Sequence, residues 1–255
     1  MKKLYSFIAT MVISIVVFGQ VSLTTLNTAY TQNFDGLAST GTGTGTVTTT
    51  GTSGSKVASV ILSGSLSGWY FVETTTNADG VYTASTGSAT AGDTYSYGAS
   101  SSTERALGSI ASGNLLSRYG AQFTNNTGNT IDQLDISYVG EEWRFDPARG
   151  TTIKDQITFE YSTDATSLTT GTWTAVTALL YETTNLTGTV GTRNGNDAAY
   201  RTSLSNTITG INIATGQTFW IRFVDVNVSG TDDGLAIDDF SLTPKNSTLS
   251  VGDVI

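Results

Sequence analysis

The 255-residue sequence contains no cysteine and no histidine. Without cysteine the chain forms no disulfide and offers no thiol nucleophile. Without histidine it has no Ser-His-Asp triad, no histidine general base and no histidine ligand for zinc or iron. Any active site would therefore depend on carboxylates, tyrosine, lysine or arginine.

Proline and charged residues are also scarce, with 2 prolines and 13% charged side chains beside 28 glycines. This composition, with its runs of threonine and serine, favours short strands and turns over helices. Hydrophobic residues at 38% and aromatic residues at 10% are sufficient for a core, which argues against a disordered chain. The net charge of −9 argues against a nucleic-acid backbone as the partner.

The amino terminus predicts export from the cell. Lys2 and Lys3 precede an apolar run from Leu4 to Phe18, and Gly19 follows it, which is the pattern of a secretory signal peptide. The run has about 15 residues, whereas a membrane span needs roughly 20. We therefore predict a signal peptide over residues 1–19, a secreted or bacterial cell-surface protein, and no membrane span in the mature chain.

Short segments with alternating apolar and polar residues follow one another along the chain, separated by turn-forming clusters. None shows a convincing helical period. The pattern predicts an all-β fold, an antiparallel and jelly-roll-like β-sandwich of about ten strands, with an all-β barrel as the alternative. One domain is expected over residues 20–245, with the Thr/Gly-rich segment 38–55 as a solvated loop. Residues 246–255 are expected to be a tail or the start of a further C-terminal module.

The best-patterned stretch, Phe219 to Leu242, predicts two strands joined as a hairpin by a short Gly/Asp turn. Strict alternation would place Asp239 in the core, but a β-bulge at Asp238–Asp239 moves both carboxylates to the edge. Such carboxylates are oxygen ligands of the kind that calcium binds. Asp35 is a third candidate ligand, because first and last strands often pair in sandwiches. Alternatively, these acids only solubilise a turn and cap backbone amides.

Several charged residues lie inside predicted strands, where charges are uncommon unless they face solvent or form pairs. A glycosidase would need two carboxylates from different strands on one concave face, such as Glu104 with Glu141 or Glu142. The alternative is that buried Glu–Arg pairs hold neighbouring strands in register.

Aromatic side chains offer a different chemistry, because exposed tryptophan and tyrosine can stack on sugar rings, although most large aromatics in such a chain belong to the core. The candidates are Trp69, Tyr70, Tyr95, Tyr97, Trp143, Trp173 and Trp220. Trp143 is the preferred platform, because it follows two acids on a strand whose other face is apolar. The predicted ligand-binding residues are Glu104, Arg105, Glu141, Glu142, Trp143 and Arg144.

Six segments carry a recognisable combination of motifs: Asn33–Gly36, Thr103–Gly108, Gly120–Gly128, Ser137–Arg144, Phe219–Arg222 and Asp233–Leu242. Together they resemble a β-sandwich module of secreted bacterial surface proteins, which also occurs near the front of large extracellular nucleases. The catalytic domain of those nucleases lies downstream of the module, so the resemblance does not imply nuclease activity here.

The closing segment Ala236–Leu242 is also similar to the last strand of jelly-roll carbohydrate-binding and adhesion domains. In such domains an N-terminal acid and the closing aspartate often share a structural calcium ion. The resemblance implies that Asp35, with Asp238 or Asp239, would hold this Ca²⁺.

We therefore predict a secreted, non-catalytic β-sandwich that binds extracellular polysaccharide or mediates adhesion to surface components, with one structural Ca²⁺ as its only expected cofactor. No catalytic residue is assigned, and no nucleic-acid partner is expected. One alternative is an accessory or spacer domain of a larger extracellular protein, for example a nuclease. A second alternative is a carboxylate-based glycoside hydrolase.

Overall fold

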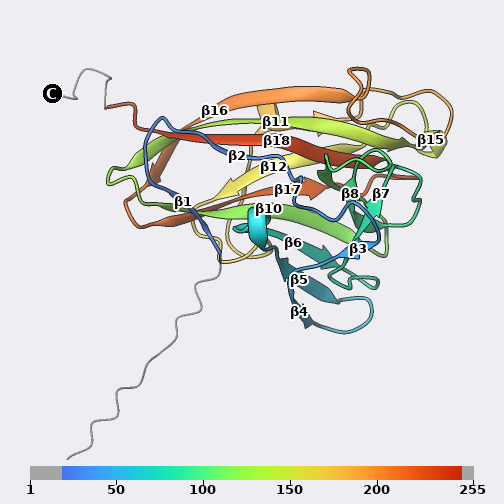
Figure 1. Cartoon of the computed structure of the whole chain (residues 1–255), viewed down its shortest axis with the longest axis horizontal. Helices are drawn as coiled ribbons and strands as arrows, with labels where there is room; N and C mark the ends of the chain where they lie inside the picture. Colours follow the sequence, from blue (N-terminus) through green and yellow to red (C-terminus); the bar gives the residue numbers. More distant parts are fainter. Residues whose placement is uncertain (1–18, 249–255) are drawn as a thin grey trace, which may run out of the picture.

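The computed structural model of the chain describes residues 19–248. The predicted signal peptide, except for Gly19, and residues 249–255 of the predicted tail lie outside the described residues. The described chain forms two nine-stranded sheets, seen as two layers in Figure 1. The predicted all-β sandwich is confirmed. The strands number eighteen instead of about ten, because connecting segments add several strands of two or three residues.

The first sheet, sheet A, has the strand order β13-β12-β17-β10-β6-β5-β4, with β1 beside β10 and β14 beside β12. Its strands are β1 (Val21–Leu23), β4 (Thr46–Thr50), β5 (Val57–Ile61), β6 (Trp69–Thr74), β10 (Leu116–Asn125), β12 (Gln156–Ser162), β13 (Thr174–Ala175), β14 (Tyr181–Glu182) and β17 (Thr218–Asp225).

The second sheet, sheet B, has the order β15-β11-β18-β9-β8-β7-β3, with β16 beside β11 and β2 beside β18. Its strands are β2 (Tyr30–Gln32), β3 (Thr42–Gly43), β7 (Tyr82–Ser85), β8 (Asp93–Tyr97), β9 (Ala106–Ile110), β11 (Ile131–Phe145), β15 (Gly191–Thr192), β16 (Arg201–Ile213) and β18 (Gly234–Lys245). Strand pairs are antiparallel except for β1 with β10 and β7 with β8.

Helical structure within residues 19–248 is limited to three 3₁₀ turns: η1 (Gly64–Leu66), η2 (Pro147–Arg149) and η3 (Thr177–Leu179). In this described part of the chain, no helix has the length and apolar character required to cross a bilayer.

The core fills the space between the two sheets, because alternate side chains of the long strands point inward. Phe223 of β17 is fully buried at its centre. Its ring centroid lies 6.0 Å from that of Tyr119 in the same sheet, and 4.9 Å and 6.1 Å from those of Tyr138 and Phe240 in the opposite sheet. Aromatic contacts thus join the two layers directly.

Strands β17 and β18 belong to different sheets. β17 pairs with β10 and β12 in sheet A, whereas β18 pairs with β11, β9 and β2 in sheet B. The prediction of a hairpin over Phe219–Leu242 is therefore wrong. Each strand has an apolar inner face, and the two pack against each other across the core instead of sharing hydrogen bonds, with residues 226–233 crossing between the layers.

The bulge in β18 is confirmed. Its pairing with β11 shifts between Ser137 and Val139, and Asp239 takes a positive φ of 49°. Phe240 is buried while the Asp239 side chain is 58% exposed, as the bulge requires. Asp238, however, is only 4% exposed, so just one of the two carboxylates reaches the edge. The second strand, β2, pairs with β18, whereas the first described strand, β1, pairs with β10 in sheet A. The expected pairing with the closing strand is therefore met by the strand just before Asp35 and not by the first strand.

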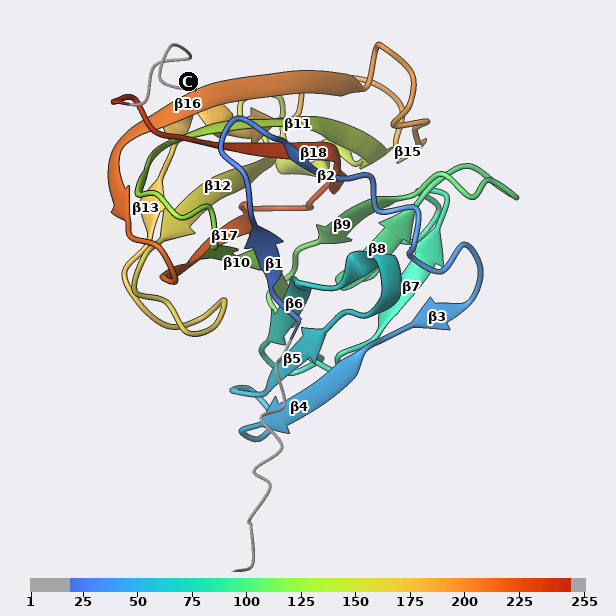
Figure 2. The ribbon, with the colours of Figure 1, turned by 60° about the vertical axis from the view of Figure 1, so that its left-hand side comes forward.

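The Thr/Gly-rich segment 38–55 is partly ordered as strand. β4 pairs along its whole length with β5 and forms an edge of sheet A, and Figure 2 shows the two strands extending away from the rest of the sandwich. The prediction of a loop is wrong for β3 and β4. All five residues of β4 are nevertheless exposed. Four of them are threonines, whose side chains need no apolar cover, and the fifth is Val47.

Candidate functional site

The outer face of each sheet carries a small apolar cluster of its own. The sheet B cluster consists of the buried residues Tyr95, Tyr97, Ala106, Ile110, Trp143 and Ala236. The sheet A cluster consists of the buried residues Val72, Ala165, Leu168 and Trp220, with Val57, Tyr70 and Trp173 partly buried against them. Each cluster contains a tryptophan on a long strand, and the two tryptophans differ in their surroundings.

Trp143 of β11 is closed off from solvent, with 1% of its surface exposed. Its ring stacks on Tyr97 at a centroid distance of 6.0 Å, and its indole Nε1 donates to Glu141 Oε2 at 2.9 Å. Gly195 lies so close that a Cβ added there would be 2.3 Å from the indole nitrogen. The prediction of an exposed sugar-binding platform at Trp143 is wrong, because an aromatic partner and a covering loop occupy its faces.

The charged residues predicted to bind ligand beside Trp143 are also largely buried. Glu141 and Glu142 are fully buried, Arg105 is 1% exposed and Arg144 is 9% exposed. Glu142 accepts a hydrogen bond from Thr183 Oγ1 at 2.9 Å, on the opposite face of β11 from Glu141. These side chains do not form an open binding surface.

Glu–Arg pairing explains only part of this burial. Arg105 donates to the hydroxyl and carbonyl oxygens of Ser96. Glu141 has Arg201 Nη2 at 3.9 Å from its Oε1, and Glu104 accepts from Asn196. Among Glu104, Glu141 and Glu142, only Glu141 has an arginine opposite it on the neighbouring strand. On sheet A, Arg222 of β17 pairs in the same way with Glu160 of β12 at 2.6 Å, so Glu–Arg pairs that hold strands in register are found at two places.

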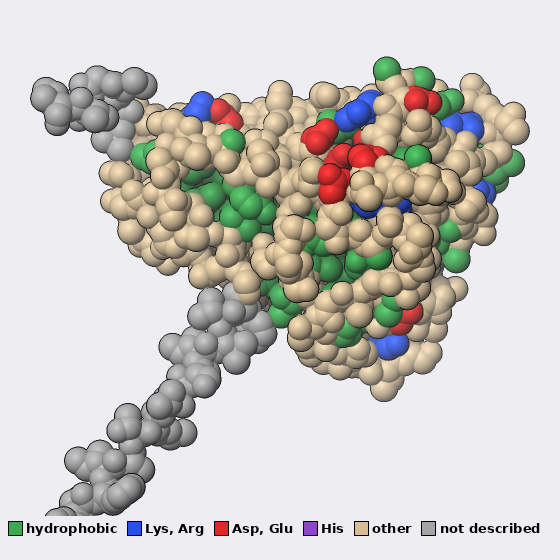
Figure 3. Space-filling model, in the orientation of Figure 1, with side chains coloured by type: hydrophobic (Ala, Val, Ile, Leu, Met, Phe, Trp, Pro, Cys, Tyr) green, Lys and Arg blue, Asp and Glu red, His purple; other side chains and the backbone are tan. Residues whose placement is uncertain are grey.

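Three acids of the outer face of sheet B lie together: Glu104, Glu141 and Asp238. One carboxylate oxygen of each lies within 4.8 Å of the others. Burial raises the pKa of Glu141 to about 7 and that of Asp238 to about 9, because desolvation disfavours the charged form. We call these three residues the β18 acid cluster. Figure 3 shows acidic side chains gathered in one patch on one side of the molecule, with basic side chains beside it.

The three predicted calcium ligands, Asp35, Asp238 and Asp239, do not form one cluster. Asp238 belongs to the β18 acid cluster. Asp35 instead accepts from the backbone N–H of Arg105 at 3.1 Å, and the exposed Asp239 pairs with Arg201 at 3.4 Å.

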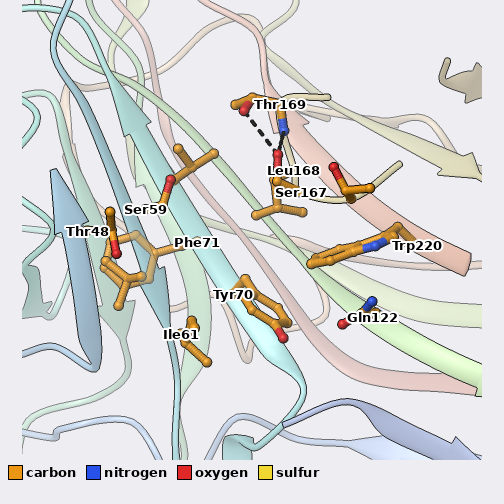
Figure 4. A pocket seen from close by; sticks show the side chains of 13 residues that line it. Thr48, Ser59, Ile61, Tyr70, Phe71, Gln122, Ser167, Leu168, Thr169 and Trp220 are labelled. Carbon is orange, nitrogen blue, oxygen red and sulfur yellow. Dashed lines mark hydrogen bonds between the residues drawn. The ribbon is translucent and has the colours of Figure 1, made fainter. Parts of the chain in front are cut away.

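Sheet A carries a groove of about 360 Å³ beside its apolar cluster. One side is formed by β4, β5 and β6 and the other by the loop Thr166–Thr169, with no charged residue among those that line it. Figure 4 shows Tyr70 and Trp220 in the groove with Gln122 next to them. The volume lies within the range of ligand pockets, roughly 300–1,000 Å³.

Strand register explains why two aromatic rings meet in this groove. Tyr70 of β6 pairs with Gly120 of β10, and Trp220 of β17 pairs with Gln122 on the other side of β10. Because Gly120 has no side chain, the two rings approach each other above β10, with centroids 4.8 Å apart. A Cβ at Gly120 would lie 2.9 Å from Leu168 Cδ2, so this glycine also lets the loop approach the strand.

The loop wall of the groove is held by its own hydrogen bonds. Thr170 Oγ1 accepts from the backbone N–H groups of Thr166 and Ser167 at 3.1 Å and 3.0 Å, and Ser167 bonds to Thr169 (Figure 4). Arg222 Nη1 of β17 donates to the Leu168 carbonyl at 2.6 Å. Contacts within the chain therefore hold the wall in place.

Two polar groups in the groove stand out. Trp220 Nε1 is buried and has no hydrogen-bond partner within the described residues. The Tyr70 hydroxyl donates to the Gly19 carbonyl at 2.9 Å. An unpaired buried donor is costly, and because Trp220 Nε1 is itself closed off from solvent, a ligand in the groove reaches it only if neighbouring side chains shift.

No family model and no curated protein matches this chain. Several solved structures resemble it. TmCBM61, solved in complex with β-1,4-galactotriose, is 14% identical with a TM-score of 0.31 over 57% of this chain and 74% of that chain. The K1 cleaved adhesin domain of Lys-gingipain from Porphyromonas gingivalis W83 is 11% identical with a TM-score of 0.36 over 86% of this chain and 99% of that chain. At such TM-scores the likeness supports no inference about what this chain binds, so the function is argued from its own residues.

Proposed function

We propose that this chain is a binding module for a neutral polysaccharide, which it holds in the groove on the outer face of sheet A. The observation that carries the proposal is the pair of rings, Tyr70 and Trp220, 4.8 Å apart in a preformed groove of about 360 Å³.

The lining of the groove matches the two kinds of surface on a sugar. The half-buried ring of Tyr70 can pack on the apolar C–H face of a pyranose, and the nearly buried ring of Trp220 supports it at a centroid distance of 4.8 Å. Hydroxyl and amide groups of the lining, from Thr48, Ser59, Ser167 and Gln122, can exchange hydrogen bonds with sugar hydroxyls. Because no charged side chain lines the groove, a neutral glycan fits better than an acidic one.

Cleavage of the signal peptide during export would free a polar group of the groove, the Tyr70 hydroxyl. The Tyr70 hydroxyl bonds to the carbonyl of Gly19, and the sequence predicts cleavage between Gly19 and Gln20. Removal of the signal peptide would take this acceptor away and leave the hydroxyl available to a ligand outside the cell. The predicted secretion and the proposed binding site are therefore consistent with each other.

The glycoside hydrolase alternative gains no support from this groove, because none of the residues that line it is Asp or Glu, and glycoside hydrolysis generally needs two carboxylates at the scissile bond. Glu104 and Glu141 do come together, but they do so next to the enclosed Trp143. If no glycan binds, the result would support the alternative that the chain is an accessory or spacer domain.

The test is binding of the secreted chain to a glycan array and to insoluble polysaccharides, followed by titration of the best ligand. Tyr70→Ala removes a half-buried ring from the groove and is expected to weaken binding at least roughly tenfold, about 1.4 kcal/mol. Gln122→Ala should give a smaller loss. The matched control is Tyr200→Ala, which removes an equally half-buried tyrosine that packs on Arg193 away from the groove.

Unchanged affinity of folded Tyr70→Ala would contradict the placement of the site. Absence of binding to every glycan tested would favour the accessory or spacer alternative instead.

A further inference from the structure

The β18 acid cluster combines carboxylates from three neighbouring parts of sheet B. Glu141 lies on β11, Asp238 lies beside the bulge of β18, and Glu104 lies two residues before the start of β9. β18 lies between β11 and β9 in the sheet. Alternation places Asp238, paired with Val139, on the same outer face as Glu141. Backbone pairing therefore fixes Glu141 and Asp238, and Glu104 joins them from the segment that leads into β9.

Each of these carboxylates has one oxygen that is buried and has no hydrogen-bond partner within the described residues: Glu104 Oε1, Glu141 Oε1 and Asp238 Oδ1. The residues themselves are deeply placed, with Glu141 fully buried and Asp238 only 4% exposed. Buried polar atoms in native proteins are almost always paired. Three unpaired oxygens on three adjacent carboxylates therefore need an explanation.

The spacing of these groups fits a bound cation. Calcium binds carboxylate oxygens at about 2.3–2.6 Å, so two oxygens on one ion lie no further apart than roughly 5 Å. One oxygen of each carboxylate in the cluster lies within 4.8 Å of the other two. Three side chains can therefore reach one ion, with water to complete its coordination.

The local charge also calls for a cation. Four carboxylates gather here when the exposed Asp239 is included, and Arg201 is the guanidinium in contact with them, 3.4 Å from Asp239 and 3.9 Å from Glu141 Oε1. Arg105 lies next to Glu104 in the chain, but its guanidinium is occupied by Ser96 and Ser85. When these acids are ionised, their negative charge exceeds the single positive charge of Arg201, and a bound cation would favour the ionised forms that burial disfavours.

A second acidic cluster, Glu73, Asp79 and Asp93, differs from the first in its hydrogen bonds. Its carboxylates approach one another as closely. Glu73 Oε2 accepts from the N–H groups of Asp79 and Gly80, and its Oε1 accepts from the Thr94 hydroxyl. None of its acids has an unpaired buried oxygen, so the protein satisfies this cluster by itself.

We infer that Glu104, Glu141 and Asp238 form a binding site for a divalent cation that prefers oxygen ligands, Ca²⁺ in particular, and that this ion locks β9, β11 and β18 together. The site is independent of the proposed glycan groove, which lies on the other sheet. It retains Asp238 from the ligand set implied by the sequence and replaces Asp35 and Asp239 with Glu104 and Glu141.

Tb³⁺, which occupies oxygen-ligand calcium sites, provides a direct probe. The indole of Trp143 donates to Glu141, so excitation of tryptophan should sensitise Tb³⁺ bound in this cluster. We expect Tb³⁺ luminescence that Ca²⁺ competes away, and a Tm that rises with Ca²⁺ concentration and falls with EDTA.

Substitutions of the proposed ligands show where the ion binds. Asp238→Asn and Glu104→Gln should each weaken Tb³⁺ binding at least roughly tenfold. Glu104 is partly exposed, so its variant serves as the test if Asp238→Asn fails to fold. Glu73→Gln is the matched control, a buried acid in the satisfied cluster, and it should leave Tb³⁺ binding unchanged.

The inference is overturned if the folded wild-type chain gives no sensitised Tb³⁺ luminescence and no shift of Tm with Ca²⁺. It is equally overturned if Asp35→Asn or Asp239→Asn abolishes binding while Glu104→Gln does not. Because glycan binding is measured separately on the groove variants, either proposal can fail without the other.

Discussion

Trp143 and Trp220 occupy comparable positions on opposite faces of the sandwich. Each lies on the outer face of a long strand, and each is nearly buried, with 1% and 3% of its surface exposed. Their indole nitrogens differ. That of Trp143 donates to the buried Glu141, whereas that of Trp220 has no partner within the described residues and its ring borders a groove. The ring of Trp143 is enclosed by packing, whereas the ring of Trp220 supports the half-buried Tyr70 at the edge of an open volume that can hold a ligand.

The same contrast holds for the acids. The β18 acid cluster has three unpaired buried oxygens, whereas the cluster around Glu73 has none. Composition and spacing are similar in the two clusters, so neither distinguishes a binding site from a self-sufficient hydrogen-bond network. The number of buried polar atoms without a hydrogen-bond partner distinguishes a binding site from such a network.

The largest loss of stability is expected from Trp143→Ala, which removes the central ring of the apolar cluster on sheet B. Loss of a fully buried tryptophan costs about 3–5 kcal/mol, and Glu141 also loses its indole donor. Urea unfolding followed by circular dichroism measures this loss. Glycan affinity of the remaining folded protein should be unchanged, and a variant as stable as the wild type would contradict the packing role of Trp143.

The next effect sharpens the contrast between the acid clusters. Burial raises the pKa of Glu73 to about 7 from its ordinary value of 4.5. The folded chain therefore holds a proton in this interval that the unfolded chain releases. The stability contributed by this proton is fully present below about pH 4 and is lost as the pH rises through about 7.

Glu73→Gln should remove this pH dependence, on the order of 3 kcal/mol between about pH 4 and pH 8. The amide oxygen of the glutamine can still accept from Asp79 and Gly80, which keeps the fold intact. Urea unfolding at several pH values provides the measurement, and parallel stability curves for the variant and the wild type would refute the assignment.

A smaller effect is expected from Gly120→Ala on the open face. The added methyl group would lie 2.1 Å from the Ile221 carbonyl oxygen and 2.9 Å from Leu168, so the loop and strand must shift. We expect a destabilisation of roughly 1–3 kcal/mol together with weaker glycan binding, measured by thermal unfolding and titration. Ala121→Gly, at a neighbouring buried position that faces the core, is the control: it should lower stability without moving the loop. Wild-type glycan affinity in folded Gly120→Ala would mean that the loop wall is not part of the site.

The sequence was sufficient for the fold class and for some local details. Alternation predicted the β-sandwich, and the conflict between Asp239 and its apolar neighbours predicted the bulge in β18. It could not separate a hairpin from two strands that face each other across the core, because β17 and β18 have the same local pattern in both arrangements. Their sheet membership depends on partners such as β10 and β11, which are distant in the chain.

The site was harder to predict for a related reason. Tyr70 and Trp220 were among the aromatic candidates, but alternation shows only that a ring leaves the core face of a strand. Whether that ring is then covered depends on loops, such as those around Gly195 and Leu168, whose positions follow from long-range packing. The acids Glu104, Glu141 and Asp238 were all singled out, but as members of two separate sites, because nothing local shows that they converge.

The most direct test of the account is a comparison of the two indoles in solution. The four tryptophans give indole N–H signals in a ¹⁵N-resolved NMR spectrum, and Trp143→Phe and Trp220→Phe assign two of them. On titration with a glycan that binds the wild type, the Trp220 signal should shift while the Trp143 signal stays in place. A shift of Trp143 with an unmoved Trp220 would contradict the assignment of the open face as the binding face.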